Sequence, residues 1–250
     1  MKLRNYTIKL TFALVALLAT TACQDKLEEL PENKAFTNET DYTISSNMDL
    51  PLKGVYATFN AIAWENYPLI SVRGDDVNAG GLGDQQAFAD TDGYKYDKDF
   101  WMYNSVWQNY YGYIFTAQSA MDQIALYKEQ ASNKTLADQY IAEVKVIRAW
   151  WLFNLSRVWG SVFIPTSSDP SEMLVANLAT KDEVMKHISA QMDAAISFLP
   201  ATHPNKRIDI PGGVTKYTAL AIKALANLEL KNYQVVADAT GEIRNIHSGT

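Results

Sequence analysis

The residues best suited to non-covalent ligand binding gather between Glu65 and Asn104. This stretch contains five glycines and seven aspartates, and it ends in a group of aromatic residues: Tyr94, Tyr96, Phe100, Trp101 and Tyr103. Flat rings can stack on the apolar face of a ligand, while carboxylates, amides and guanidinium groups can hydrogen-bond its polar edge. An irregular stretch of this length in a compact domain usually has a function. The ligand site of the chain is therefore expected here.

Particular residues in this stretch can be given roles. Trp101 and Asn104 are one helical turn apart and can offer a stacking ring and an amide from one face. Tyr103 is assigned to the same ligand-binding group, and the polar side of the site is assigned to Arg73, Asp75 and Asp76. The alternative is that Trp101 and Tyr103 only pack the loop onto the helices. The clustering of the aromatic residues favours a ligand site.

Patterns typical of catalysis or metal binding are weak. The three histidines lack the spacing of metal ligands, and the sequence contains no Gly-x-Ser-x-Gly motif. The stretch Asp90 to Gly93 begins like a calcium loop, but its glycine comes too early for an EF-hand and no glutamate closes it. The adjacent Asp75 and Asp76 could serve a glycosidase, but such pairs in glycine-rich loops are more often solvated or bound to calcium. We predict no catalytic residue, metal site or cofactor.

The only cysteine, Cys23, follows a pattern typical of an export signal. A basic start leads into an apolar stretch from Leu10 to Leu18, and small residues follow up to Ala22. The apolar stretch is too short to cross a membrane. Residues 1–22 are therefore interpreted as a lipoprotein signal peptide and Cys23 as the site of lipid attachment, although Thr20 stands where such signals usually carry leucine. Ordinary secretion with an incidental cysteine is the alternative.

The chain is acidic, with a net charge of −6, and acidic residues are dense behind Cys23. Residues 23–34 are interpreted as a solvated acidic tether. Acidic residues beside a lipidated cysteine also resemble the surface-export signal of Bacteroidota lipoproteins, with a plain linker as the alternative. The negative charge disfavours nucleic acid and anionic lipid as partners. With one thiol in the chain, no intramolecular disulfide can form, so stability must come from the core.

Apolar residues at helical spacing predict a mostly α fold from Pro51 onward. The predicted helices cover Pro51 to Ile62, Val106 to Ile124, Leu136 to Trp159, Thr180 to Leu199, Tyr217 to Leu228 and Tyr233 to Ile246. In the third helix, Trp151 and Leu155 belong to the stripe that faces the core. The fourth helix begins with Thr180 and Glu183 at the spacing of a capping box. No alternation of strands and helices indicates a doubly wound sheet.

The last two predicted helices have the character of a repeat. Ala224, Leu228, Tyr233 and Ala237 are spaced as in a tetratricopeptide-type helical hairpin, without a strict repeat of the whole sequence unit. The predicted architecture is therefore a set of tetratricopeptide-like helical hairpins with a long irregular loop region.

Several segments resemble one family, the SusD/RagB nutrient-binding lipoproteins of bacterial outer membranes. The stretch Ala142 to Ala149, followed by Trp159-Gly160 and Pro165, resembles the family's helix motif Gly-Glu-Ala-Arg-Phe-Leu-Arg-Ala and its Gly-x-Val-Pro turn. Alanine and lysine replace the first Gly and the first Arg of that motif, and an extra residue precedes the proline. Residues 182–200, which end in Leu-Pro, resemble the next helix, and residues 215–233 the hairpin after it.

This resemblance covers the chain from the signal to Thr250 and implies a function. It implies a lipoprotein of the outer membrane, facing the cell exterior, that binds an oligosaccharide or related nutrient. It also implies a SusC-like TonB-dependent transporter as the partner that receives the ligand. Family members are longer, so residues 35–250 are interpreted as an N-terminal helical-repeat domain truncated at its C-terminus. Two other classes remain open: a lipoprotein scaffold that binds protein, and, with least support, a glycan-cleaving enzyme.

Overall fold

The structure is a computed structural model that describes residues 40–61, 71–80 and 85–248. The predicted signal peptide (1–22), the tether (23–34) and Cys23 lie outside the described residues. In the described part of the chain, no helix is both long enough and apolar enough to cross a membrane. The contacts group Tyr42–Thr250 into one unit.

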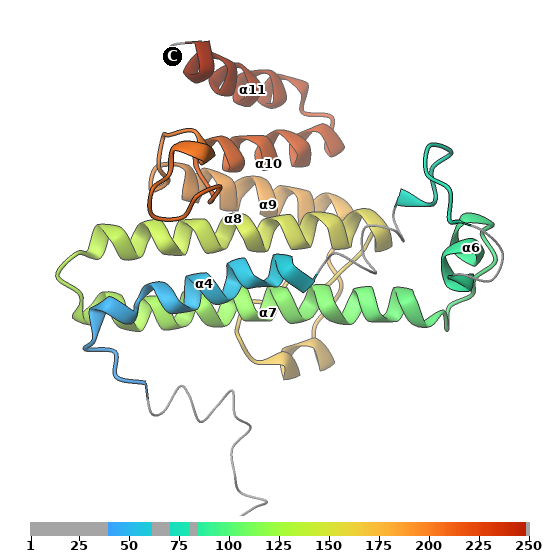
Figure 1. Ribbon diagram of the computed structural model, residues 1–250, viewed down its shortest axis with the longest axis horizontal. Coiled ribbons are helices and arrows are strands. Elements are labelled where there is room, and N and C mark those ends of the chain that lie inside the picture. Colours follow the sequence, from blue (N-terminus) through green and yellow to red (C-terminus); the bar gives the residue numbers. More distant parts are fainter. Residues whose placement is uncertain (1–39, 62–70, 81–84, 249–250) are drawn as a thin grey trace, which may run out of the picture. The chain divides into compact units, whose positions relative to one another are not determined.

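Five helices of this unit pack side by side in chain order (Figure 1). They are α7 (Trp101–Gln130), α8 (Lys134–Trp159), α9 (Lys181–Ile196), α10 (Lys216–Glu229) and α11 (Tyr233–Ser248). A shorter helix, α4 (Asp49–Ala57), lies against both α7 and α8. The predicted mostly α fold with tetratricopeptide-like hairpins is confirmed.

The remaining elements are short. They are the 3-10 turns η1 (Ser45–Asn47), η2 (Thr58–Ala61), η3 (Pro170–Leu174) and η4 (Pro204–Lys206), together with α6 (Gln86–Asp92). An antiparallel bridge joins Val162 to Ala179, with backbone hydrogen bonds of 3.0 and 2.9 Å, and closes the loop between α8 and α9.

The core is centred on α8. Trp151 is 1% exposed. The centre of its ring lies 5.0, 5.4 and 4.9 Å from the ring centres of Phe59, Tyr110 and Tyr113. Leu155 is fully buried one turn later, so the predicted orientation of this stripe is confirmed. However, α8 is buried on more than one face, because it lies between α7 and α9 and also contacts α4 and α10.

Local signals determine where α8 ends and α9 begins. The side chain of Asn133 accepts a hydrogen bond from the Leu136 N–H at 3.1 Å and caps the start of α8. Gly160 ends this helix with a φ of +77°, which a glycine adopts without strain. The capping box of α9 is present, because the Thr180 N–H donates to Glu183 Oε2 at 2.7 Å and the Glu183 N–H donates to Thr180 Oγ1 at 3.4 Å.

The helix limits differ most from the predicted ones in α4 and α7, and one helix was not predicted. Helix α4 begins at Asp49, before Pro51, and ends at Ala57, before the predicted limit at Ile62, whereas α7 extends the predicted range at both ends. At the first end of α7, Met102 is 1% exposed, so the buried stripe continues there. Helix α6 forms inside the stretch that was predicted to be irregular, and its Phe88 and Thr91 side chains are buried. The irregular region is therefore shorter than the sequence indicated.

Candidate ligand-binding site

The first turn of α7 carries three of the predicted site residues. Trp101 is 56% exposed and Asn104 is exposed, whereas Tyr103 is half-buried and Met102 is buried. This follows from helical geometry, because residues three apart share a face and the two residues between them point to other sides of the helix. Trp101 and Asn104 therefore present a ring and an amide to solvent from one face of a helix whose opposite face is in the core.

Tyr103 belongs to an aromatic cluster with Tyr96 and Phe100. The centres of the three rings lie 5.1, 5.6 and 5.9 Å apart in tilted arrangements. Such contacts add to the stability gained from burying the rings. Burial raises the pKa of Tyr103, and the nearby charge of Arg73 opposes that rise. Tyr103 therefore packs against neighbouring rings, as the packing alternative expects, whereas the Trp101 ring is exposed. The ligand-binding role of both residues stays a prediction.

Arg73 is brought to the aromatic cluster by Tyr94. The guanidinium carbon of Arg73 lies 5.6 Å from the centre of the Tyr94 ring, and the Tyr94 hydroxyl donates to the Arg73 carbonyl at 3.1 Å. The Tyr94 ring in turn lies 6.3 Å from that of Tyr96. Arg73 and Tyr103, predicted from distant positions in the stretch, are therefore held in one region.

Asp75 and Asp76 lie in an exposed turn. The Gly74 N–H donates to the Ser71 carbonyl at 3.0 Å, and the Val77 N–H donates to the Gly74 carbonyl at 3.4 Å. A Cβ atom at Gly74 would lie only 2.9 Å from Asp76 Oδ1, so a larger residue there would displace the Asp76 side chain. Within the described residues, neither carboxylate forms a hydrogen bond or an ion pair with Trp101 or Asn104. Their grouping with the α7 residues stays a prediction.

Tyr94 is the residue that the sequence-based site assignment omitted. Its ring is 61% exposed, and its backbone has a φ of +53°, a left-handed conformation that non-glycine residues rarely adopt. Residues in such conformations gather at functional sites. The sequence placed Tyr94 in the aromatic cluster, but it contains no signal for the left-handed backbone or for the contact with Arg73.

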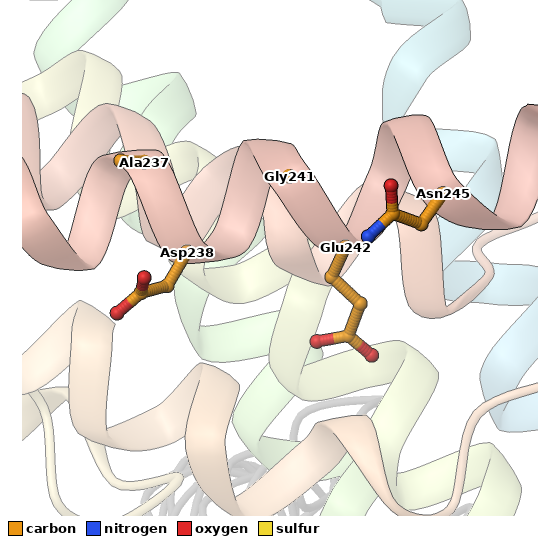
Figure 2. Close-up of a pocket in the computed structure, with 5 residues that line it drawn as sticks. All are labelled: Ala237, Asp238, Gly241, Glu242 and Asn245. Carbon is orange, nitrogen blue, oxygen red and sulfur yellow. The ribbon is translucent and has the colours of Figure 1, made fainter.

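Two hollows in the described surface lie elsewhere. The first, of about 540 Å³, is lined by Ala237, Asp238, Gly241, Glu242 and Asn245 of α11 alone (Figure 2). Asp238 and Glu242 point to the same side of the helix. Both are engaged, because Asp238 accepts from Gln234 at 2.8 Å and Glu242 pairs with Lys216 of α10 at 2.5 Å. Glu242 therefore joins α11 to α10, and Asp238 makes a contact within α11.

The second hollow, of about 310 Å³, lies between α8, α10 and η2. Its lining is almost wholly apolar and contains no charged residue: Phe59, Val146, Ile147, Trp150, Val214, Thr218, Ala221, Ile222 and Leu225. It offers few hydrogen-bonding groups to a polar ligand. Across the described residues, no group of three or more His, Cys, Asp or Glu side chains could hold a metal ion.

The fold and these residues define a class of protein: a stack of helical hairpins that presents an exposed aromatic ring with polar groups nearby. The chain belongs to the SusD-like family described as "Starch-binding associating with outer membrane", whose sequence pattern it matches over residues 27–226. A comparison with curated proteins gave no significant match.

Solved structures share the fold. A SusD-like carbohydrate binding protein from Bacteroides fragilis superposes with a TM-score of 0.68 at 18% identity, over 82% of this chain and 41% of that protein. A laminarin-binding SusD-like protein gives a TM-score of 0.66 at 22% identity, over 78% of this chain and 42% of that protein. A SusD superfamily protein from Bacteroides thetaiotaomicron gives 0.68 at 21% identity, over 83% and 49%. This chain thus spans less than half the length of each of these proteins.

Proposed function

We propose that this chain is a cell-surface lipoprotein that binds an oligosaccharide and delivers it to a SusC-like TonB-dependent transporter of the outer membrane. Membership of the SusD-like family supports the proposal, as do two of the similar structures, one of a carbohydrate binding protein and one of a laminarin-binding protein. Lipid attachment at Cys23 would anchor the protein to the outer membrane, facing the cell exterior.

The observation that carries the binding proposal is the exposure of Trp101 at the start of a buried helix. An indole ring that is 56% exposed contributes little to the core, and its backbone position is set by the first turn of α7. A sugar ring presents apolar C–H groups on its faces and hydroxyls at its edge, so it can stack on Trp101 while Asn104 and Arg73 hydrogen-bond its hydroxyls.

The experiment is affinity electrophoresis of the purified chain in gels that contain single polysaccharides, followed by analysis of the sugar. We expect retardation by at least one glycan without release of new reducing ends, because no catalytic role is assigned to any residue. Release of reducing ends would contradict the binding-only function and favour a glycan-cleaving enzyme. Absence of retardation in every gel, with binding to a protein instead, would favour the scaffold alternative.

A further inference from the structure

The charges around Trp101 and Arg73 are predominantly negative. Among the described residues from 71 to 104, aspartates stand at 75, 76, 90, 92, 97 and 99, and basic residues only at 73, 95 and 98. Lys98 is paired with Asp99 at 3.4 Å, and both side chains are largely exposed, at 89% and 76%. Arg73 is held over the ring of Tyr94 and is followed in the same turn by Asp75 and Asp76. Each basic side chain near the site therefore has an acidic residue close by in sequence.

From this charge distribution we propose that the site binds an uncharged glycan and discriminates against glycans that carry uronate or sulfate groups. The inference rests on the proposed glycan-binding function and names the class of ligand. Asp99 and Asp97 are exposed and stand two and four residues before Trp101, so a ligand stacked on Trp101 would have both carboxylates in its neighbourhood. An anionic group on that ligand would be repelled by these carboxylates, even across water.

A neutral, hydroxyl-rich ligand meets the same carboxylates favourably. Carboxylate oxygens only accept hydrogen bonds, and the hydroxyls of a sugar can donate to them. Arg73 can also donate hydrogen bonds to such a ligand, because its guanidinium carries five N–H donors and is held with its carbon 5.6 Å from the centre of the Tyr94 ring. The carboxylates near the site thus accept hydrogen bonds from the hydroxyls of a neutral glycan, and they repel the anionic groups of a charged glycan.

The test is affinity electrophoresis of the purified chain in a panel of neutral polysaccharides and their charged derivatives. The panel includes dextran with dextran sulfate, and hydroxyethylcellulose with carboxymethylcellulose, together with a carboxymethylated form of whichever neutral glycan binds most tightly. We expect the neutral form to bind at least about tenfold more tightly than its charged derivative at low salt, and the difference to shrink as salt screens the aspartates. Tighter binding of an acidic glycan would overturn the inference and leave glycan binding intact.

A charge variant tests the cause directly. Asp97→Asn with Asp99→Asn removes two negative charges beside Trp101, and asparagine at 97 keeps the oxygen that accepts the Asp99 N–H at 2.9 Å. We expect severalfold tighter binding of the carboxymethylated glycan and unchanged binding of the neutral one. The matched control is Asp238→Asn on α11, which should leave the binding of both the carboxymethylated and the neutral glycan unchanged. Equal effects of the two variants would overturn the inference, whereas failure of every glycan to bind would contradict the proposed function itself.

Discussion

Arg207 and Glu143 form a buried ion pair in which Arg207 Nη1 lies 2.9 Å from Glu143 Oε2. The two side chains are only 2% and 0% exposed. Arg207 belongs to the loop between α9 and α10, and Glu143 lies in α8. The Tyr56 hydroxyl, from α4, donates to the same carboxylate oxygen at 2.6 Å and accepts the Val214 N–H at 2.8 Å. Burial, followed by the charge of Glu143, raises the pKa of Tyr56, so its hydroxyl stays protonated.

Truncating Glu143 should therefore be strongly destabilising. Glu143→Ala leaves the buried guanidinium of Arg207 without this partner, and loss of one partner of a buried pair typically costs about 3–5 kcal/mol. The free energy of unfolding, from chemical denaturation, measures the loss. The control is Asp49→Ala, which breaks a partly exposed i,i+4 pair with Lys53, 2.7 Å long, and should cost about 0.5 kcal/mol. Similar losses in both variants would contradict a structural role for the buried pair.

The packing of α8 gives a second stability prediction. Leu155 is fully buried, so Leu155→Ala should lower the free energy of unfolding by about 2–5 kcal/mol through lost burial and the remaining cavity. Leu126→Ala on α7 is the matched control, because Leu126 is 43% exposed. An unchanged Tm for Leu155→Ala would mean that this stripe contributes nothing to the core.

The spacing of residues along the sequence was sufficient to predict structural features that depend only on residues close together in the chain. The burial of Trp151 and Leu155 follows from spacing along one helix, and the Thr180–Glu183 capping box depends on residues three apart. The Glu143–Arg207 pair joins residues far apart in sequence, and no local pattern indicates which loop returns to α8.

The candidate site was predictable in part for the same reason. The spacing of Trp101 and Asn104 indicates that they share a helical face. The predicted helix began only at Val106, but Met102, Val106 and Tyr110 form a buried stripe that reaches the first turn of α7. The contact of Arg73 with Tyr94 depends on a backbone conformation that sequence propensity does not favour. The sequence therefore indicated the shared face of Trp101 and Asn104, but not the residue that holds Arg73, and the grouping of these residues into one ligand site stays a prediction.

His187 of α9 should make stability depend on pH. Burial, followed by the charge of Arg148, lowers its pKa to about 4 from 6.5. Between these two pH values the unfolded chain binds a proton at His187 more readily than the folded protein does. The stabilisation is therefore complete above about pH 6.5 and is lost progressively as the pH falls towards 4.

The comparison of wild type with His187→Leu isolates this effect, because the carboxylates titrate alike in both proteins. The wild-type Tm should fall more steeply than that of the variant between pH 7 and pH 4.5. Parallel curves would mean that His187 takes up its proton equally well in the folded and unfolded states.

The anchor assignment depends on Cys23 alone, since the chain has no other cysteine. Cells that express the wild-type protein should incorporate a labelled fatty acid into it, and Cys23→Ala should abolish the label. The variant should also leave the membrane fraction or keep its signal peptide. Equal labelling of the two proteins would contradict lipid attachment at this residue.

The final prediction separates ligand binding from folding at α7. If the exposed Trp101 ring is a stacking platform, Trp101→Ala should weaken glycan binding by about 1–3 kcal/mol, with base–aromatic stacking as the analogy for the size of a flat-ring contact. The Tm should change little, because the indole is 56% exposed. Asn104→Ala should weaken binding less, by about 0.5–1.5 kcal/mol, since it removes a single hydrogen-bonding amide.

The matched control for Trp101→Ala is Tyr233→Ala on α11, where the ring is 64% exposed and lies in a different helix. This control should bind glycan as the wild type does, which distinguishes a specific platform from a general effect of exposed aromatic residues. Calorimetric titration measures binding per folded molecule, and thermal unfolding measures the Tm of each variant. A large fall in Tm for Trp101→Ala with unchanged binding would mean that the indole supports the fold and that the glycan contacts other residues.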